Sequence, residues 1–194
     1  MKLNKYINYL LNYREISLAE KIVVGAGGIK FDGWVSIDYE LLDLLDRPSF
    51  KRYWKEGSRT HILAEHVWEH LSLSDGYLAA SNCFDFLQHK GRLRIAVPDG
   101  FHPDKEYIDY VKPGGAGVGS DDHKVLYNYT TLSKLLTSAG FDTELLEYWD
   151  DKGRFNAVDW KVDDGMIRRS IKYDNRNKNG KPNYTSLVID AIKP

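Results

Sequence analysis

The chain has 194 residues, a single cysteine and a formal net charge of −1 from 27 basic and 28 acidic residues. This length predicts one domain, residues 1–194, with a core of its own. The near-neutral charge excludes the broad basic surface of proteins that bind nucleic acid in bulk. The single cysteine, Cys83, excludes an internal disulfide and any metal site built from several cysteines. Because no apolar run approaches the ~20 residues of a membrane span and the N-terminus lacks a signal-peptide pattern, we expect a cytoplasmic protein.

Apolar periodicity in the first part of the chain predicts helices and buried strands. Leucine and isoleucine at helical spacing predict an amphipathic helix over 3–14. The segment 40–55 has a helical pattern that Pro48 interrupts. Short β-branched or apolar runs predict buried strands at 21–24, 34–38 and 61–64.

The remaining chain continues this alternation. A helix is predicted from about 75 to 89, capped by Ser74 or Asp75 and closed by Lys90-Gly91, and a second over 130–139, capped by Thr130 or Thr131 and ended by Gly140. Further strands are predicted at 92–97, 144–149 and 184–192. We expect a long loop over 99–122 and a loop or hairpin insertion over about 150–183. Strands that alternate with helices indicate an α/β fold with a mostly parallel sheet covered on both faces.

The segment 22–38, IVVGAGGIKFDGWVSID, has the pattern of a nucleoside site. An apolar strand breaks into Gly25-Ala26-Gly27-Gly28, and a second strand ends on Asp38. Glycines let the backbone approach a ligand closely, and a carboxylate at the next strand tip accepts hydrogen bonds from ribose hydroxyls. A glycine-rich turn followed by a surface aspartate is the alternative interpretation.

Three further segments, in the same order along the chain, resemble one family. ILAEHVWEHL at 62–71 is similar to the strand-four signature of class I S-adenosylmethionine-dependent methyltransferases, and of their small type 11 group in particular. KGRLRIAVPD at 90–99 resembles strand five of that family, and LSKLLTSAGF at 132–141 resembles the helix and turn before strand six. With the glycine-rich segment, the resemblance covers roughly residues 20–150.

The resemblance implies a Rossmann-like, doubly wound sheet of seven mostly parallel strands, with an antiparallel last strand at 184–192. It also implies S-adenosyl-L-methionine as cofactor, lying across the carboxyl ends of strands one, two and four. Carried over by position, the cofactor-binding residues are Gly25, Ala26, Gly27 and Gly28 for the methionine and ribose part, Asp38 for the ribose hydroxyls, Tyr39 beside the adenine, and Ala64, Glu65 and His66 facing the sulfonium and the acceptor.

The sequence departs from the family pattern between strands one and four. Only nine residues separate Gly28 from Asp38, so a loop or single turn must replace the usual crossover helix. No clear third strand lies between Asp38 and the strand at 61–64. Asp43 and Asp46 are candidates for the acid that contacts adenine, with solvated helix acids as the alternative.

Three residues are candidates for catalysis. Asp99, just after strand five, is placed to bind the acceptor or act as general base, although Pro98-Asp99-Gly100 is also a common turn. His102 and His123 lie on or beside the long loop, where a histidine could remove a proton from an acceptor hydroxyl. Polar loop residues are the alternative interpretation for both.

The residues His66, Glu69 and His70 also fit the H-x-x-E-H pattern of inverted zinc peptidases. That pattern needs a third ligand on a distant helix, and here it directly follows a strand, so zinc hydrolysis is a remote alternative. In the methyltransferase interpretation we assign no metal ligand.

The predicted function is methyl transfer to an oxygen or nitrogen atom of a small or medium acceptor such as a sugar or other glycan, a lipid or a metabolite. The arginine-rich segment 159–177 could bind a phosphate or carboxylate on that acceptor, but runs of charge more often form what we favour here, a solvated, partly mobile hairpin with internal ion pairs. The alternative from another class is a non-catalytic protein that binds the cofactor or a partner chain.

Overall fold

The computed structural model describes residues 12–177 and 180–194, which build a seven-stranded sheet of order β2-β1-β3-β4-β7-β5-β6. The strands β1 to β4 are parallel to one another. The strand β7 is antiparallel to both its neighbours, β4 and β5, and β6 is antiparallel to β5. Their bounds are Lys21–Val24 (β1), Val35–Ile37 (β2), Arg59–Glu65 (β3), Leu87–Pro98 (β4), Asp142–Trp149 (β5), Phe155–Ala157 (β6) and Ser186–Ile192 (β7).

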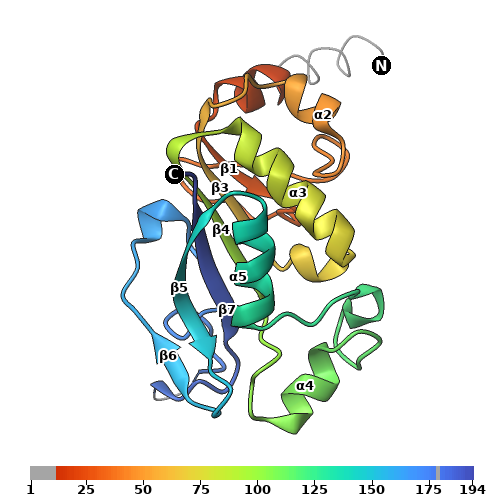
Figure 1. Cartoon of the computed structure of the whole chain (residues 1–194), viewed down its shortest axis with the longest axis vertical. Coiled ribbons are helices and arrows are strands. Elements are labelled where there is room, and N and C mark those ends of the chain that lie inside the picture. The colour runs from red at the N-terminus through yellow and green to blue at the C-terminus, as the bar shows by residue number, and fades with distance from the viewer. Residues whose placement is uncertain (1–11, 178–179) are drawn as a thin grey trace.

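The helices α3 (Leu73–Phe86) and α5 (Tyr129–Ser138) pack on one face of the sheet, as Figure 1 shows. Side chains alternate between the two faces along each strand. Ile22 and Val24 of β1 therefore join the large core beneath these helices, whereas Val23 faces the other side. Residues 12–18 are also helical, so the predicted N-terminal helix lies mostly outside the described residues.

The other face of the sheet is covered without an α-helix in the described part of the chain. The connection between β6 and β7 packs there, with Ile167 fully buried in a small core that also contains Leu63 and Trp160. The buried ion pair of Arg94 with Asp190 lies on β4 and β7, and Arg94 donates hydrogen bonds to the carbonyls of Lys161 and Gly165. The segment 159–177 is therefore packed against this face in part, and the prediction of a solvated hairpin does not hold for Ile167 and its neighbours.

The sheet is shortened at one edge and extended at the other. All of residues 38–58 are described, and they contain only the short helix α2 (Arg47–Lys51), so β2 is the edge strand and no third strand lies beyond it. The ten residues from Gly25 to Trp34 form turns and contain no helix. The short spacing between Gly28 and Asp38 predicted this. The opposite edge gains β6 by a hairpin from β5.

Three local predictions were wrong, each for a physical reason. Pro48 lies in the first turn of α2 rather than interrupting a longer helix, because backbone N–H groups in the first turn have no intrahelical acceptor and proline loses no hydrogen bond there. The helix α3 is capped by Ser72, whose Oγ accepts a hydrogen bond from Asp75 N, and it ends at Phe86. Lys90-Gly91 lies within β4, where the Lys90 amide pairs with the carbonyl of Lys193.

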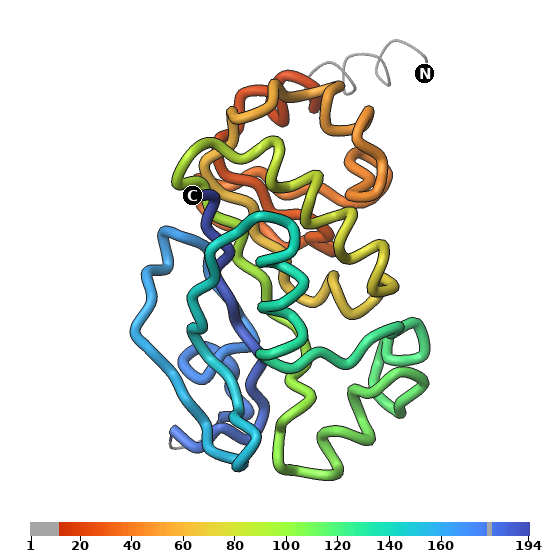
Figure 2. The backbone as a smooth tube through the Cα atoms, in the orientation of Figure 1, coloured from red at the N-terminus to blue at the C-terminus, as the bar shows by residue number. Residues whose placement is uncertain are grey.

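The first long connection, 99–122, lies beyond the carboxyl ends of the parallel strands, at the lower end of the molecule in Figure 2. The second, between β6 and β7, runs back along the sheet toward the amino ends of these strands, where Lys21 Nζ donates a hydrogen bond to the carbonyl of Asp163. The first is not wholly a loop, since it contains α4 (Lys105–Val111) and the 3-10 turn η2 (Ser120–Asp122). The second contains the 3-10 turn η3 (Val162–Asp164). A further 3-10 turn, η1 (Trp68–His70), follows β3. None of the helices in the described residues has the length and apolar character of a membrane span.

Candidate active site

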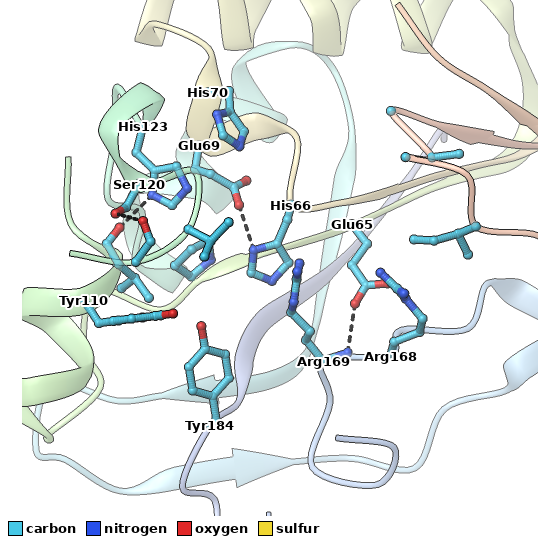
Figure 3. Close-up of a pocket in the computed structure, with 18 residues that line it drawn as sticks. Glu65, His66, Glu69, His70, Tyr110, Ser120, His123, Arg168, Arg169 and Tyr184 are labelled. Atoms are coloured by element: carbon cyan, nitrogen blue, oxygen red, sulfur yellow. Dashed lines mark hydrogen bonds and ion pairs between the residues drawn. The ribbon is translucent and has the colours of Figure 1, made fainter. Parts of the chain in front are cut away.

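A pocket of about 330 Å³ opens at the carboxyl ends of β1, β3 and β4. Parallel α/β sheets bind ligands at this edge in general. Figure 3 shows the side chains that surround the pocket. The lining residues are Gly25, Ala26, Gly27, Ile29, Glu65, His66, Glu69, His70, Pro98, Tyr110, Val111, Gly117, Val118, Ser120, His123, Arg168, Arg169 and Tyr184.

The glycine turn after β1 forms one wall of this pocket. Gly25 has φ +58°, and a Cβ at this position would lie 2.6 Å from Cγ2 of Val67. Only glycine therefore combines this left-handed conformation with so close a neighbour. The Gly27 amide donates a 2.8 Å hydrogen bond to Oδ1 of Asp38. The predicted acid at the tip of β2 thus holds the turn through one of its oxygens.

The predicted residues on the ribose and adenine side lie at the margin of the pocket or outside it. Asp38 is half-buried, and Tyr39 is 73% exposed. Gly28, at the end of the turn, and Asp38, just after β2, do not line the pocket. Ala64 is fully buried beneath the pocket. Oδ1 of Asp43 accepts a hydrogen bond from Leu45 N, so that carboxylate stabilises a local turn.

The residues that follow β3 bring a histidine and a buried carboxylate together. His66 has φ +59°, an unusual conformation for a residue with a Cβ, and its ring lies between Ser186 and Glu69. Its Nε2 is 3.0 Å from Ser186 Oγ, and its Nδ1 is 2.8 Å from Glu69 Oε1. Burial of Glu69 would raise the pKa of its carboxyl, but the contacts with His66 outweigh burial and hold this pKa below its usual range.

Glu65 connects the tip of β3 to the connection between β6 and β7. Its Oε1 accepts a 2.8 Å hydrogen bond from Arg169 N, and its Oε2 lies 3.4 Å from Nε of Arg168. The Arg169 side chain extends beside His66 and Tyr184 in Figure 3. The segment that covers the second sheet face therefore also supplies two guanidinium groups to the pocket.

His123 reaches the pocket because the chain after η2 is attached to η1. The amides of Lys124 and Val125 both donate hydrogen bonds to the carbonyl of Glu69. The His123 ring consequently lies edge-on to that of His70, with 4.8 Å between their centroids. Nδ1 of His123 is 2.7 Å from the carbonyl oxygen of Val111, so Nδ1 carries the proton and Nε2 offers a lone pair.

The other two catalytic candidates lie outside the pocket. Asp99 is fully buried, and its carboxylate accepts hydrogen bonds from the amides of Phe101 and Trp149. Burial raises the pKa of Asp99 to about 6, although these two hydrogen bonds oppose the shift. His102 stacks on Tyr107 with 4.0 Å between ring centroids, and burial lowers its pKa. Both side chains hold the start of the 99–122 connection against β5 and α4.

Sequence reasoning missed several pocket residues. Tyr110, Ser120 and Tyr184 come from connections whose contacts depend on the tertiary fold. One local signal did exist, the glycine content of the chain after α4. Gly117 is packed so closely against the Tyr110 carbonyl that a Cβ would lie 2.5 Å from its oxygen. A glycine-rich run after a helix, here 114–119, indicates such close backbone packing.

No protein-family model matches the sequence, and a search of curated proteins also found no match. Solved structures do resemble the fold. An S-adenosylmethionine-dependent methyltransferase from Archaeoglobus fulgidus is 17% identical, with a TM-score of 0.51 over 99% of this chain and 91% of its own. One from Thermotoga maritima is 13% identical, with a TM-score of 0.51 over 99% of this chain and 96% of its own.

A third similar structure comes from a Haloferax volcanii complex between the Trm112 methyltransferase activator and a candidate methyltransferase. It is 9% identical, with a TM-score of 0.53 over 94% of this chain and 89% of that one. At these identities the likeness establishes architecture. The chain has the class I methyltransferase fold, as the four sequence motifs predicted, with a mostly parallel sheet and an antiparallel β7.

Proposed function

We propose that the protein is a cytoplasmic S-adenosylmethionine-dependent methyltransferase that modifies an oxygen or nitrogen atom of a small or medium acceptor. One observation carries this proposal. The pocket at the carboxyl ends of β1 and β3 is bounded by the glycine turn that Asp38 holds through Gly27. This edge of the sheet is where the fold binds a nucleoside ligand.

The cofactor would lie with its methionine part against the glycine turn and its ribose toward Asp38. Oδ1 of Asp38 bonds to Gly27, which leaves Oδ2 for a ribose hydroxyl. Glu65 lies at the tip of β3, and a carboxylate there favours the positive charge of a sulfonium. Tyr39 would flank the adenine on the open side.

The reaction requires alignment more than new chemistry, because the cofactor supplies the leaving group. The acceptor atom forms a bond to the methyl carbon while the carbon–sulfur bond breaks and its electron pair returns to sulfur. A hydroxyl acceptor must also lose its proton. His123 faces the acceptor side of the pocket with a free Nε2 lone pair, and among the three catalytic candidates it alone lines the pocket.

The size and charge of the pocket support a sugar, a lipid headgroup or another metabolite as acceptor. The cofactor's methionine part and the acceptor would share a volume of about 330 Å³, which suits a small acceptor group. Arg168 and Arg169 suit a phosphate or carboxylate on it, and Tyr110 and Tyr184 offer hydroxyl groups and aromatic faces. With a near-neutral chain, bulk nucleic acid is a poor acceptor.

Thermal melting with and without S-adenosylhomocysteine tests the cofactor site. Ligand at about 100 times its dissociation constant adds about 2.7 kcal/mol, which raises Tm by roughly 5–10 °C for a chain of this size. Transfer of a labelled methyl group to a panel of sugars, lipid headgroups and metabolites then tests catalysis. A shift without transfer to any acceptor would favour the non-catalytic alternative. No shift at millimolar ligand would overturn the proposal.

A further inference from the structure

Three metal-binding side chains meet on the inner wall of the pocket. Glu69 and His70 come from η1, and His123 follows η2. One ligand atom from each of the three lies within 4.8 Å of the other two. Figure 3 shows the two imidazoles and the carboxylate gathered on one side of the pocket, opposite the arginines.

Both histidines are held by one ring nitrogen, which leaves the other nitrogen free. Nδ1 of His123 is 2.7 Å from the Val111 carbonyl oxygen, and Nδ1 of His70 is 3.3 Å from Oδ2 of Asp122. Histidines that bind metals are oriented in this way, with the far nitrogen bonded to a carbonyl or carboxylate. The arrangement therefore presents two Nε2 lone pairs.

Glu69 supplies a second, independent observation. Its side chain is 1% exposed, and its Oε2 has no hydrogen-bond partner among the described residues. The other oxygen, Oε1, lies 2.8 Å from Nδ1 of His66. A buried carboxylate usually has several donors, and a carboxylate that lacks them is the group that a cation would satisfy.

We propose that Glu69, His70 and His123 bind a divalent transition-metal cation of the zinc type. Two imidazoles and one carboxylate suit Zn²⁺, which binds such ligands at about 2.0–2.2 Å. In a tetrahedral site these bond lengths separate the ligand atoms by about 3.3 Å, so small side-chain rotations complete the site.

This set differs from the H-x-x-E-H alternative of the sequence analysis. His66 lies at the end of β3 in a left-handed conformation and does not share a helical face with His70. Here His123 replaces it as a ligand, and His66 instead holds Glu69 Oε1 in place.

Three protein ligands leave a fourth coordination position, and all three residues line the pocket. That open position would bind an acceptor oxygen and lower the pKa of its hydroxyl. The cation would then be bound by the Nε2 lone pair of His123, which would no longer be available to accept a proton. This use of the site rests on the proposed function, but binding of the cation does not.

Metal titration of the chelator-treated full chain tests the site. Calorimetry with Zn²⁺ should give one ion per chain with a dissociation constant in the micromolar range or below. Co²⁺ should give the visible absorption of a tetrahedral site with nitrogen and oxygen ligands, and added azide should change that spectrum because one position is open. No stoichiometric binding, or binding only at millimolar metal, would overturn the proposal.

Variants assign the ligands. His123→Ala and His70→Ala should each weaken Zn²⁺ binding at least 100-fold, and the isosteric Glu69→Gln at least tenfold. Asp122→Asn should weaken it by about tenfold, because Asp122 only orients His70. His89→Ala is the matched control, since His89 is exposed and outside the pocket, and it should leave binding unchanged. Equal affinity in wild type and His123→Ala would contradict the assignment.

Melting with S-adenosylhomocysteine in the presence of chelator separates the two proposals. Zinc binding without a rise in Tm on addition of S-adenosylhomocysteine would support the metal site and overturn the proposed methyltransferase function. A cofactor shift without zinc binding would do the reverse.

Discussion

The two sides of the candidate cofactor site differ in how completely they are built. On the acceptor side, η1, the chain before His123 and the β6–β7 connection enclose the pocket with buried carboxylates and oriented histidines. On the adenine side, β2 is an edge strand of three residues and Tyr39 is 73% exposed. The enclosed side therefore has its geometry fixed before any ligand binds.

This difference indicates which side of the site contributes more to the free energy of cofactor binding. Groups fixed in advance lose little conformational freedom on binding, whereas exposed side chains must be ordered by the ligand. We expect recognition of the cofactor to depend mainly on its methionine and ribose part. Substitutions on the two sides should then have unequal effects, and four measurements test this.

The largest effect concerns the buried carboxyl that supports the enclosed side. Because the pKa of Asp99 rises from 3.8 unfolded to about 6 folded, the folded chain holds a proton that the unfolded chain releases between these values. Stability should therefore fall by about 3 kcal/mol as pH rises from about 4 to 6, and stay level above that. Urea unfolding of wild type and Asp99→Asn across pH 4–8 measures this, since the variant lacks the fall. Parallel curves would show that Asp99 ionises normally.

The next effect concerns the glycine turn. Gly25→Ala should weaken S-adenosylhomocysteine binding at least 100-fold, because its Cβ meets the stiff, β-branched Val67 at 2.6 Å. Gly28→Ala is the matched control: Gly28 also has a positive φ, +83°, but no atom lies within 4 Å of its added Cβ. Calorimetric affinities of the two variants within threefold of each other would mean that backbone strain, not close packing, sets the effect.

Asp38 lies between the two sides and should have an intermediate effect. Asp38→Ala removes both the hydrogen bond to Gly27 and the ribose contact, a loss of about 2 kcal/mol or about 30-fold in cofactor affinity. Asp38→Asn keeps an acceptor for Gly27 and should lose less. If both variants bind as tightly as wild type, the ribose lies elsewhere.

The smallest effect is expected on the open side. Tyr39→Ala should change cofactor affinity by less than twofold, because the ring is mostly exposed and has no partner strand behind it. A loss of tenfold or more would mean that Tyr39 closes over the adenine, and that the open side becomes ordered with the ligand.

The fold was largely predictable because its signals are local. The apolar strands at 21–24 and 61–64 and the short β1–β2 connection follow from periodicity and spacing within a few residues. The glycine turn was equally visible. Its contact with Val67 was not, since these residues are 42 positions apart in sequence.

The rest of the site depends on contacts that sequence patterns do not encode. The charges of 159–177 look solvated by composition, yet Arg169 N and Ile171 N donate to the buried carboxylates Glu65 and Glu147. Similarly, nothing local indicates that His123 meets His70, because the hydrogen bonds from 124 and 125 to Glu69 bring them together. The catalytic roles of Asp99, His102 and His123 stay predictions.

The position of Ile167 affects how the candidate site can change in evolution. It is fully buried in the core of the second sheet face, and the next two residues, Arg168 and Arg169, line the pocket. One tripeptide thus contributes both to the packing of the core and to the proposed contact with the acceptor. A change of volume at this interior position would shift two cationic groups without altering either, so new acceptor preferences can arise from mutations that never touch the acceptor.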